Sequence, residues 1–408
     1  MSSPPPDDPA TYFRKGFGLK ADVRTDLSED YSGLLVDTLR ERDYTLAVGD
    51  LTIRLAREFG FCYGVERAVE YAYQARRKFP DRRLLLVGEI IHNPHVNDKL
   101  RGMGIEILVP RADGEFDFSV ITPEDVVILP AFGVTIAAFE SLRSIGCVMV
   151  DTTCGSVLNV WKRVDVYARD GFTALIHGKY HHEETRATAS QVMKHAGGRY
   201  LIVRHMEEAR IVCEYIEGRG TREAFLGHFA HAVSPAFDPD VDLECIGVAN
   251  QTTMLAKESL AIGEEVGLAM ARARGDAARA TSFRTFDTIC SATQERQDAV
   301  LALLEEPLDA MVVIGGFNSS NTISLAMLCA ERVPTYHIED ASGIDPDSGT
   351  IHFRRPEVTH IAEHRSGWLP SGVPQRIGIT AGASTPNNKI GETVARILAT
   401  RGLGLEAL

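Results

Sequence analysis

Long apolar runs are missing from this chain, since no stretch approaches the about 18 consecutive apolar residues that a membrane-spanning helix needs. The first residues have neither the basic start nor the apolar segment of a secretory signal, which predicts a cytoplasmic protein. An excess of cations is missing as well. Because nucleic-acid binding needs clustered cations, the net charge of −13 argues against a nucleic-acid partner.

Two kinds of short motif are also absent. The chain has no GxxxxGK[ST] loop and no GxGxxG after a strand-like run, so ATP and dinucleotide sites have no support. It has seven cysteines, and none stands in a CxxC pair. In a reducing compartment such cysteines do not predict a set of disulfides. Four of them lie in apolar stretches and are typical of small core residues, namely Cys147, Cys213, Cys245 and Cys329.

The chain is long, and strand-like and helix-like segments alternate along it. Its 408 residues, 44% hydrophobic and 24% charged, suffice for two or three globular domains. From Leu51 onward, strand-like runs alternate with helix-like stretches, which is typical of parallel sheets flanked by helices. The strand-like runs are 83–87, 126–129, 148–150, 173–176, 201–203, 245–248, 310–314 and 376–379. The helix-like stretches include 66–78, 191–195, 257–274, 294–304 and 324–332.

Three of the cysteines have matching surroundings. Cys154 and Cys290 each end an Asp-Thr-x-Cys phrase, and Cys62 lies in the segment Gly-Phe-Cys-Tyr-Gly. An apolar stretch leads into each cysteine and a helix-like stretch follows it. Such a repeat predicts similar modules that each present one thiolate to a shared centre. Three thiolates would leave one iron of an iron–sulfur cluster open, and the competing interpretation is three buried thiols near strand ends.

The alternation and the repeat together predict a domain organisation. The fold class is α/β, with three similar modules of mainly parallel sheets arranged around a central iron–sulfur cluster and cavity. The chain start is rich in proline and then charged, with a helical patch near 31–42, which indicates an extension that wraps the surface. The predicted borders are 1–49 for this extension, 50–151, 152–287 and 288–386 for the modules, and 387–408 for a C-terminal helix and tail.

Polar motifs follow four of the strand-like runs, where open α/β sheets bind their ligands. These motifs begin at His92, Asn250, Asn318 and Ala381. The small polar residues of 318–322 precede a helix-like stretch, so their backbone amides suit an anion. An ordinary helix cap has the same composition. Ser384 lies in a similar turn and favours the anion, whereas a lone histidine such as His92 is often satisfied by the backbone.

A dense acid–base segment, His-Gly-Lys-Tyr-His-His-Glu-Glu-Thr, occupies 177–185 beside another strand end. As an acid–base site it offers a histidine to an anion and a glutamate to a proton relay. As a metal site it predicts a zinc-dependent hydrolase built on His181, His182 and Glu184, although the HExxH spacing of zincins is missing. A polar stretch of exposed surface would have the same composition, and the residues alone do not separate these interpretations.

Taken together, the motifs resemble one family, the 4-hydroxy-3-methylbut-2-enyl diphosphate reductases of LytB type, over roughly 51–401. The segments that carry the resemblance are GFCYGVERA, GEIIHN, DTTC, HGKYHHEETRATAS, NQTTM, DTICSATQERQ, NSSNT and TAGASTP. The HEET form and the PAFG segment at 130–133 are similar to the plant and cyanobacterial branch. The resemblance implies reductive dehydroxylation of that diphosphate to isopentenyl and dimethylallyl diphosphate, the last step of the methylerythritol phosphate pathway.

The resemblance also implies a role for each motif residue. One 4Fe–4S cluster, with its fourth iron open to the substrate hydroxyl, would be held by Cys62, Cys154 and Cys290. Glu184 would deliver a proton, and Thr252 would help to position the hydroxyl. The diphosphate would be bound by His92, His182, Ser319, Ser320, Asn321 and Ser384. The implied electron donor is a ferredoxin or a flavodoxin.

The chain departs from the family pattern in a few places. Many bacterial members carry a histidine where Phe132 stands, so one diphosphate contact is missing or replaced. Gly155 follows Cys154 where proline is usual, and Asn387 stands where aspartate is common. Neither of these two changes touches a ligand position, so we expect only local differences in the backbone.

Overall fold

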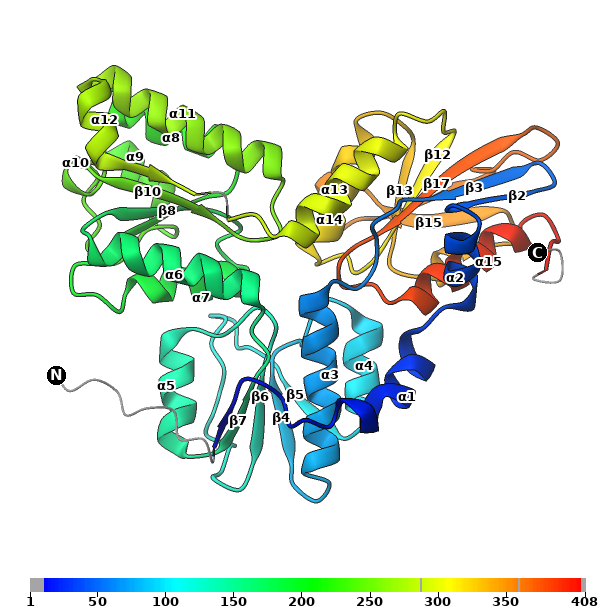
Figure 1. Ribbon diagram of the computed structural model, residues 1–408. Coiled ribbons are helices and arrows are strands. Elements are labelled where there is room, and N and C mark those ends of the chain that lie inside the picture. Colours follow the sequence, from blue (N-terminus) through cyan, green and yellow to red (C-terminus); the bar gives the residue numbers. More distant parts are fainter. Residues whose placement is uncertain (1–10, 287, 359, 405–408) are drawn as a thin grey trace. The chain divides into compact units, whose positions relative to one another are not determined.

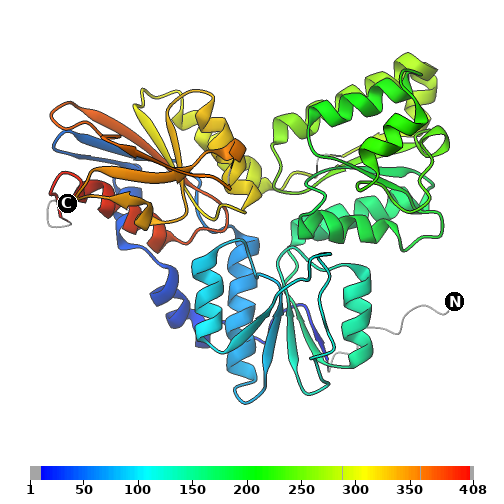
Figure 2. The ribbon, with the colours of Figure 1, turned by 180° about the vertical axis from the view of Figure 1, so that it is seen from behind.

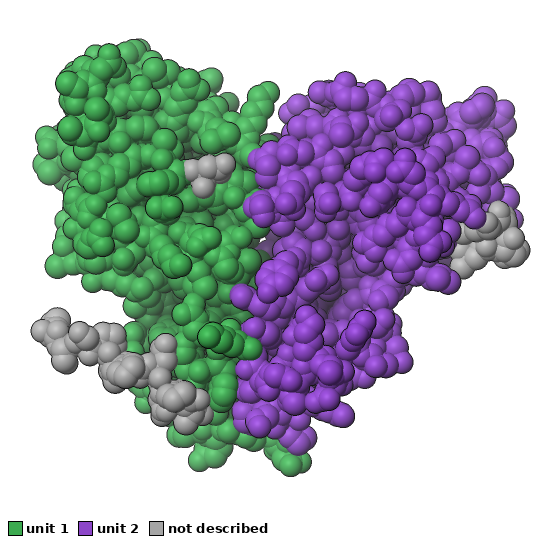
Figure 3. Space-filling view, in the orientation of Figure 1, with its two compact units in different colours: residues 1–15, 81–90, 104–290 green, residues 16–80, 91–103, 291–408 purple. Residues whose placement is uncertain are grey.

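The computed structural model describes residues 11–286, 288–358 and 360–404. The chain divides into two compact units, which Figure 3 shows in different colours. Unit 1 comprises residues 1–15, 81–90 and 104–290, and unit 2 comprises residues 16–80, 91–103 and 291–408. The predicted α/β class with mainly parallel sheets is confirmed. Among the described residues, no helix combines the length and the apolar character that crossing a membrane requires.

The first sheet of unit 1 is parallel throughout, with the strand order β1-β7-β6-β4-β5. Strands β4 and β6 consist only of buried apolar residues, as expected where both faces of a parallel sheet are covered. Strand β1 comes from the predicted extension, and its Tyr12 lies opposite Met149 of β7. The elements are β1 (Tyr12–Phe13), β4 (Leu84–Val87), β5 (Ile105–Leu108), β6 (Val126–Leu129), β7 (Val148–Asp151) and helix α5 (Ile136–Ile145).

The second sheet of unit 1 is also parallel, with the order β11-β10-β8-β9. Helices α6 and α7 cover one face, and α8 and α11 the other (Figures 1 and 2). The bounds are β8 (Thr173–His177), β9 (Tyr200–Val203), β10 (Ile246–Asn250), β11 (Phe283–Thr285), α6 (Gly155–Arg169), α7 (Glu183–Val192), α8 (Met206–Ile216), α9 (Arg222–Phe229), α10 (Pro239–Asp242), α11 (Ala256–Arg274) and α12 (Asp276–Ser282).

Unit 2 contains one mixed sheet with the order β14-β15-β13-β12-β17-β3-β2, and β16 pairs with β15. Helices α13 and α14 lie on one face, and α2 and α15 on the other (Figures 1 and 2). The strands are β2 (Thr45–Val48), β3 (Leu51–Leu55), β12 (Ala310–Ile314), β13 (Thr335–Ile338), β14 (Ile344–Asp345), β15 (Thr350–Arg354), β16 (Ala362–Ser366) and β17 (Gln375–Ala381). The helices are α1 (Lys20–Tyr31), α2 (Leu34–Glu41), α3 (Tyr63–Lys78), α4 (Pro94–Gly102), α13 (Ser291–Leu303), α14 (Ser320–Ala330) and α15 (Asn387–Ala399).

This sheet joins distant parts of the chain next to its edge strand β2. β3 pairs in parallel with β17, from Leu51 opposite Gln375 to Leu55 opposite Ile379. β2 and β3 therefore share a sheet with strands of the predicted third module, although the predicted borders placed 50–151 in one module. Those borders stay a prediction, because compactness divides the chain into two units and does not test a division into three modules.

Two predicted helices have the wrong bounds. The stretch 191–195 is not a helix of its own, because α7 begins at Glu183 and ends at Val192. Because many residues of α7 are polar, the apolar pattern did not show where this helix begins. The patch 31–42 contains two helices, because α1 ends at Tyr31 and α2 begins at Leu34. Gly33 between them packs so closely that an added Cβ would lie 2.5 Å from the carbonyl oxygen of Asn387.

A buried histidine in β13 makes the stability of the fold depend on pH. His337 is fully buried, and its Nε2 donates to the carbonyl of Gly315 at 2.9 Å. Its Nδ1 has no partner among the described residues, and burial lowers the pKa of His337 to about 4. The folded pKa is thus depressed, so stability is present above the unfolded pKa of about 6.5 and is lost as the pH falls below it.

From pH 7 to pH 5, we expect His337 to remove about 2 kcal/mol from the free energy of unfolding. Glutamine has an amide N–H where Nε2 stands and no group that titrates. Urea unfolding of the wild type and of His337→Gln at both pH values measures the difference. The variant should lose about 2 kcal/mol less on acidification, and an equal loss in both proteins would contradict this assignment.

Candidate active site

Each of the three predicted cluster ligands lies immediately before a helix. Cys62 precedes α3, Cys154 precedes α6 and Cys290 precedes α13. The N–H groups and the positive dipole at a helix N-terminus stabilise a thiolate. All three are free cysteines of intermediate burial, in contrast to the fully buried Cys147, Cys213 and Cys329. Asp287, which opens the second Asp-Thr-x-Cys phrase, lies outside the described residues.

Unit 1 brings two of these cysteines together. The hydroxyl of Ser156, in the first turn of α6, donates to Sγ of Cys290 at 3.2 Å. Burial raises the pKa of the Cys154 thiol, and the charge of Cys290 raises it further, against the opposing effect of the backbone N–H of Ser156. A thiol whose pKa is raised by burial and by a neighbouring cysteine fits a site where a metal would offset the negative charge of the thiolate. Thiolates are also the donors that iron–sulfur clusters take.

The phrase Asp-Thr-Thr-Cys forms a turn that fixes the position of Cys154. The carboxylate of Asp151 accepts hydrogen bonds from the backbone N–H of Thr153 at 2.9 Å and from its hydroxyl at 2.5 Å. The other carboxylate oxygen accepts the Tyr12 hydroxyl at 2.5 Å. Cys154 itself donates its N–H to the carbonyl of Ala131 at 3.0 Å. The acidic residue of the phrase therefore acts on the backbone that carries the thiol.

A buried carboxyl group is tied to the loop of Cys290. Glu184 is 1% exposed, and its Oε1 accepts the backbone N–H of Thr252 at 2.6 Å. The carbonyl of Thr252 accepts the N–H of Cys290 at 3.4 Å. One peptide segment thus connects the carboxyl to a predicted cluster ligand. The structure places Glu184, Thr252 and Cys290 together within unit 1, and the link runs through the backbone of Thr252.

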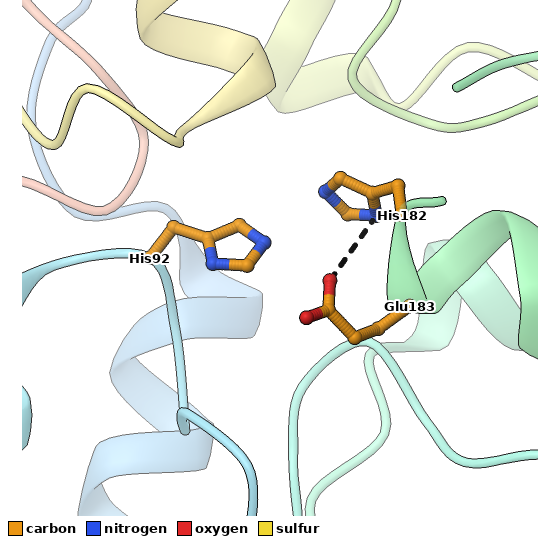
Figure 4. Close-up of side chains that lie close together, drawn as sticks. All are labelled: His92, His182 and Glu183. Carbon is orange, nitrogen blue, oxygen red and sulfur yellow. Dashed lines mark ion pairs between the residues drawn. The ribbon is translucent and has the colours of Figure 1, made fainter. Parts of the chain in front are cut away.

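His182 caps the helix that carries this carboxyl group. The ring is 8% exposed, and its Nδ1 accepts the N–H of Glu184 at 3.1 Å, so that Nε2 carries the proton of the neutral ring. Nδ1 also lies 3.9 Å from a carboxylate oxygen of Glu183, as Figure 4 shows. Phe132 meets the imidazole edge to face, with ring centroids 5.5 Å apart. At the position of the missing histidine, Phe132 thus orients His182 and brings no polar atom.

The residues of the predicted zinc site do not share a common environment. His181 is exposed, and its ring packs on Tyr180 with centroids 4.6 Å apart. His182 is buried and directs Nδ1 to its own helix, while Glu184 binds the backbone of Thr252. Their described partners orient these side chains individually.

The predicted diphosphate ligands of unit 2 converge at the start of α14. Ser319 caps this helix by accepting the N–H of Thr322 at 3.4 Å. The Ser384 hydroxyl lies 3.5 Å from that of Ser319 and donates to the carbonyl of His92 at 3.2 Å. Asn321 accepts the N–H of Ala383 at 2.8 Å. The buried side chains gathered here are His92, Ser319, Ser320, Asn321 and Ser384.

The backbone at this helix start is packed too closely for larger residues. A Cβ added at Gly316 would lie 2.6 Å from the carbonyl oxygen of His92. The His92 ring, drawn in Figure 4, has Nδ1 3.3 Å from the Asn318 amide nitrogen. A helix N-terminus surrounded by hydroxyl, amide and imidazole groups is suited to an anion. The side chains of this group include no lysine or arginine, and the described residues of α14 include none either.

Sequence analysis missed two residues that hold these groups in place. Asn93 caps α4, and its amide donates to the carbonyl of Ser384 at 2.8 Å. An asparagine directly before a proline is a signal for a helix start, but nothing in the sequence reveals its bond to Ser384. Ser156, the donor to Cys290, had no signal at all, because one serine in a helical pattern is unremarkable.

Comparison with known proteins supplies the family context. A family model described as "LytB protein" matches residues 53–398. The 4-hydroxy-3-methylbut-2-enyl diphosphate reductase of Gloeobacter violaceus is 48% identical over 397 residues, which cover 96% of this chain and 93% of that protein. The reductase of Thermosynechococcus vestitus is 48% identical over 393 residues, which cover 96% of this chain and 95% of that protein. These cyanobacterial relatives agree with the predicted branch.

Solved structures are similar as well. A structure of (E)-4-hydroxy-3-methyl-but-2-enyl diphosphate reductase, described as the terminal enzyme of the non-mevalonate pathway, matches with 27% identity and a TM-score of 0.51. It covers 85% of this chain and 98% of that one. The E-1-hydroxy-2-methyl-but-2-enyl-4-diphosphate reductase from Plasmodium falciparum shares the fold, with a TM-score of 0.61, 20% identity, and coverage of 85% and 87%.

Proposed function

Because the chain belongs to the LytB protein family, we propose that it reduces 4-hydroxy-3-methylbut-2-enyl diphosphate to isopentenyl and dimethylallyl diphosphate, the last step of the methylerythritol phosphate pathway. Two electrons and two protons replace the hydroxyl group, which leaves as water. The observation that carries this proposal is the 48% identity to a curated reductase along 96% of the chain. The relatives do not support a zinc-dependent hydrolase built on His181, His182 and Glu184.

The proposed cofactor is one 4Fe–4S cluster with three cysteine ligands, Cys62, Cys154 and Cys290. Their positions before helices, and the proximity of Cys154 to Cys290, support this assignment. When bound, such a cluster supplies single electrons and an open iron that polarises the substrate hydroxyl. A ferredoxin or flavodoxin as electron donor is part of the proposal, and the cytoplasmic location stays a prediction.

The side chains around the start of α14 are proposed to bind the diphosphate. Hydrogen bonds to a charged group are stronger than neutral ones, so hydroxyls, an amide and the helix N-terminus can hold an anion without lysine. Fixing the diphosphate also fixes the allylic alcohol at the other end of the molecule. The proposed ligands are His92, Ser319, Ser320, Asn321 and Ser384, and in unit 1 His182.

Glu184 is the proposed proton donor to the departing hydroxyl. It is buried, and its Oε1 accepts the backbone N–H of Thr252, a hydrogen bond that does not use the carboxyl proton. The side-chain hydroxyl of Thr252 is proposed to position the substrate hydroxyl or to pass the proton to it. The bond between the Thr252 carbonyl and the N–H of Cys290 supports a common position for acid and cluster ligand.

Replacing Ser384 with alanine is expected to raise KM about tenfold while the cluster remains intact. The hydroxyl is buried beside Ser319, and a lost hydrogen bond to a charged group costs about 1.5–3 kcal/mol. Anaerobic steady-state kinetics measure the effect. Ser348→Ala is the control, because that serine is exposed and its hydroxyl donates to Asp345, away from the start of α14. An unchanged KM in Ser384→Ala would remove this residue from the diphosphate site.

Anaerobic purification followed by iron, sulfide and visible-absorption measurements tests the proposed function. Brown protein with iron and sulfide, which converts the substrate to both products when a low-potential reductant is added, is the expected result. Protein with zinc but neither iron nor sulfide would overturn the proposal.

A further inference from the structure

A buried arginine without a carboxylate partner lies beside the loop of Cys62. Arg296 belongs to α13 and is 3% exposed. Among the described residues, no carboxylate lies within ion-pair distance of it, although most arginines of this structure form surface ion pairs. Burying a charge without a counter-ion carries a large desolvation cost. A specific set of hydrogen bonds must offset that cost.

The guanidinium group donates hydrogen bonds to backbone carbonyls. Nη2 donates to the carbonyl of Gly60 at 2.7 Å and to that of Phe61 at 3.2 Å, and Nε donates to Gly60 at 3.2 Å. Nη1 donates to the carbonyl of Ala292, in the first turn of α13, at 2.8 Å. The planar fork thus connects the first turn of α13 to the peptide groups just before Cys62.

The other side of the same loop is fixed by the end of β17. The N–H of Gly60 donates to the carbonyl of Ala381 at 3.3 Å, and the N–H of Cys62 donates to that of Ala383 at 3.2 Å. Gly60 has a φ of +67°, and a Cβ there would lie 3.1 Å from the carbonyl oxygen of Thr385. The loop is therefore held through its N–H groups on one side and through its carbonyls by Arg296 on the other.

We propose that Arg296 is a positioning residue for the iron–sulfur cluster. Its fork fixes the peptide groups of 60–61, and thereby the backbone from which Cys62 presents its sulfur. Its charge has no carboxylate within ion-pair distance among the described residues, and Glu66 in the first turn of α3 interacts with it only at longer range. The cation is therefore also placed to offset the negative charge that thiolates and a reduced cluster introduce. This inference rests on the proposed function, because it assigns a role toward the cofactor of that same site.

Lysine and glutamine variants separate the two contributions of Arg296. Lysine keeps the positive charge but has one nitrogen in place of a planar fork, so it cannot bind the carbonyls of Gly60, Phe61 and Ala292 with the same geometry. Glutamine loses the charge and most of the donors. Positioning therefore predicts a defect in both variants, whereas charge balance predicts a defect only in the glutamine variant.

The experiment uses the full chain, purified anaerobically as wild type, Arg296→Lys and Arg296→Gln. Iron and sulfide per chain report how much cluster is held, and a redox titration followed by electron paramagnetic resonance reports its potential. We expect severalfold less iron and sulfide in both variants. The cluster that remains should have a more negative potential in Arg296→Gln and a wild-type potential in Arg296→Lys, because an added electron is less stabilised when the cation is absent.

Arg401→Gln is the matched control. Arg401 also belongs to unit 2, is mostly buried, and donates to the carbonyls of Leu369 and Pro370, but it has a carboxylate partner in Asp50. Its variant should lower the melting temperature and leave cluster content and potential as in the wild type.

Specific outcomes overturn the inference. Wild-type cluster content in soluble Arg296→Lys removes the positioning role, and this variant decides the matter if Arg296→Gln does not fold. A lower melting temperature with unchanged potential in Arg296→Gln, as in the Arg401 control, removes the charge effect. If the wild-type protein holds a cluster and reduces the substrate while both variants resemble it, the inference alone fails. If the wild type holds no iron or sulfide, the proposed function fails with it.

Discussion

Replacing Glu184 with glutamine is expected to lower kcat by a hundredfold or more while leaving iron and sulfide content unchanged. The amide has the same size, and its oxygen can still accept the N–H of Thr252, so the link to the loop of Cys290 persists. It has no proton to give to the departing hydroxyl. General acid catalysis contributes about 10²–10⁴-fold to enzymatic rates. Anaerobic turnover and metal analysis of the same sample measure both quantities.

Glu207→Gln provides the comparison for this variant. Glu207 lies in the first turn of α8, as Glu184 lies in the first turn of α7, but it is exposed. Both substitutions replace a carboxyl group with an amide in the first turn of a helix, so a shared effect would come from that replacement and not from proton donation. Near-wild-type turnover in Glu184→Gln would take this residue out of the proton path.

Serine in place of Cys154 is expected to remove the visible chromophore together with all measurable turnover. A serine hydroxyl at neutral pH does not supply the thiolate that an iron–sulfur cluster needs, and Cys290 would then be left as the one cluster ligand proposed in unit 1. Visible absorption reports the presence of the cluster, and iron analysis quantifies its loss. Retention of a full cluster in this variant would show that Cys154 is not a ligand.

Cys213→Ser distinguishes this effect from a general loss of stability. Cys213 is packed in the hydrophobic core around β8 and β10, where burial raises the pKa of its thiol to about 12. The thiol therefore stays protonated and is not available to a metal. Its variant buries a hydroxyl at a cost of about 1–3 kcal/mol and should melt at a lower temperature with its colour intact. A loss of colour equal to that of Cys154→Ser would contradict the assignment of ligands.

Sequence patterns located strands that are buried on both faces and missed others, such as β5, β13 and β15, that carry polar or partly exposed residues. β6 and β12 consist entirely of apolar residues, and their predicted bounds match the observed ones. The apolar pattern does not indicate which strands pair with each other, because an apolar strand can lie beside any other. The pairing of β3 with β17 was therefore not predicted. The two residues of β1 are too few to form a pattern at all.

The candidate site was predictable to the extent that side chains perform its chemistry. The cysteines and the residues at the start of α14 could be named from the sequence because they stand in a repeated phrase and in a run of small polar residues, and the family resemblance implied their roles. The structure shows that Thr252 links Glu184 to Cys290 through its backbone N–H and carbonyl groups. Because almost every residue has these groups, the sequence gives no signal for this link. In the sequence, Arg296 looks like an exposed arginine on a helix, and only the fold shows that it is buried.

The pairing of β3 with β17 also determines when, during synthesis, the loop of Cys62 can be held in place. During translation β3 and Cys62 leave the ribosome long before β17 and Ala383, which hold them. Until then the hairpin of β2 and β3 exposes an open edge and an unprotected thiol, a state that chaperones recognise in nascent chains. A chain that is terminated before β17 lacks the carbonyls of Ala381 and Ala383, which hold the loop of Cys62.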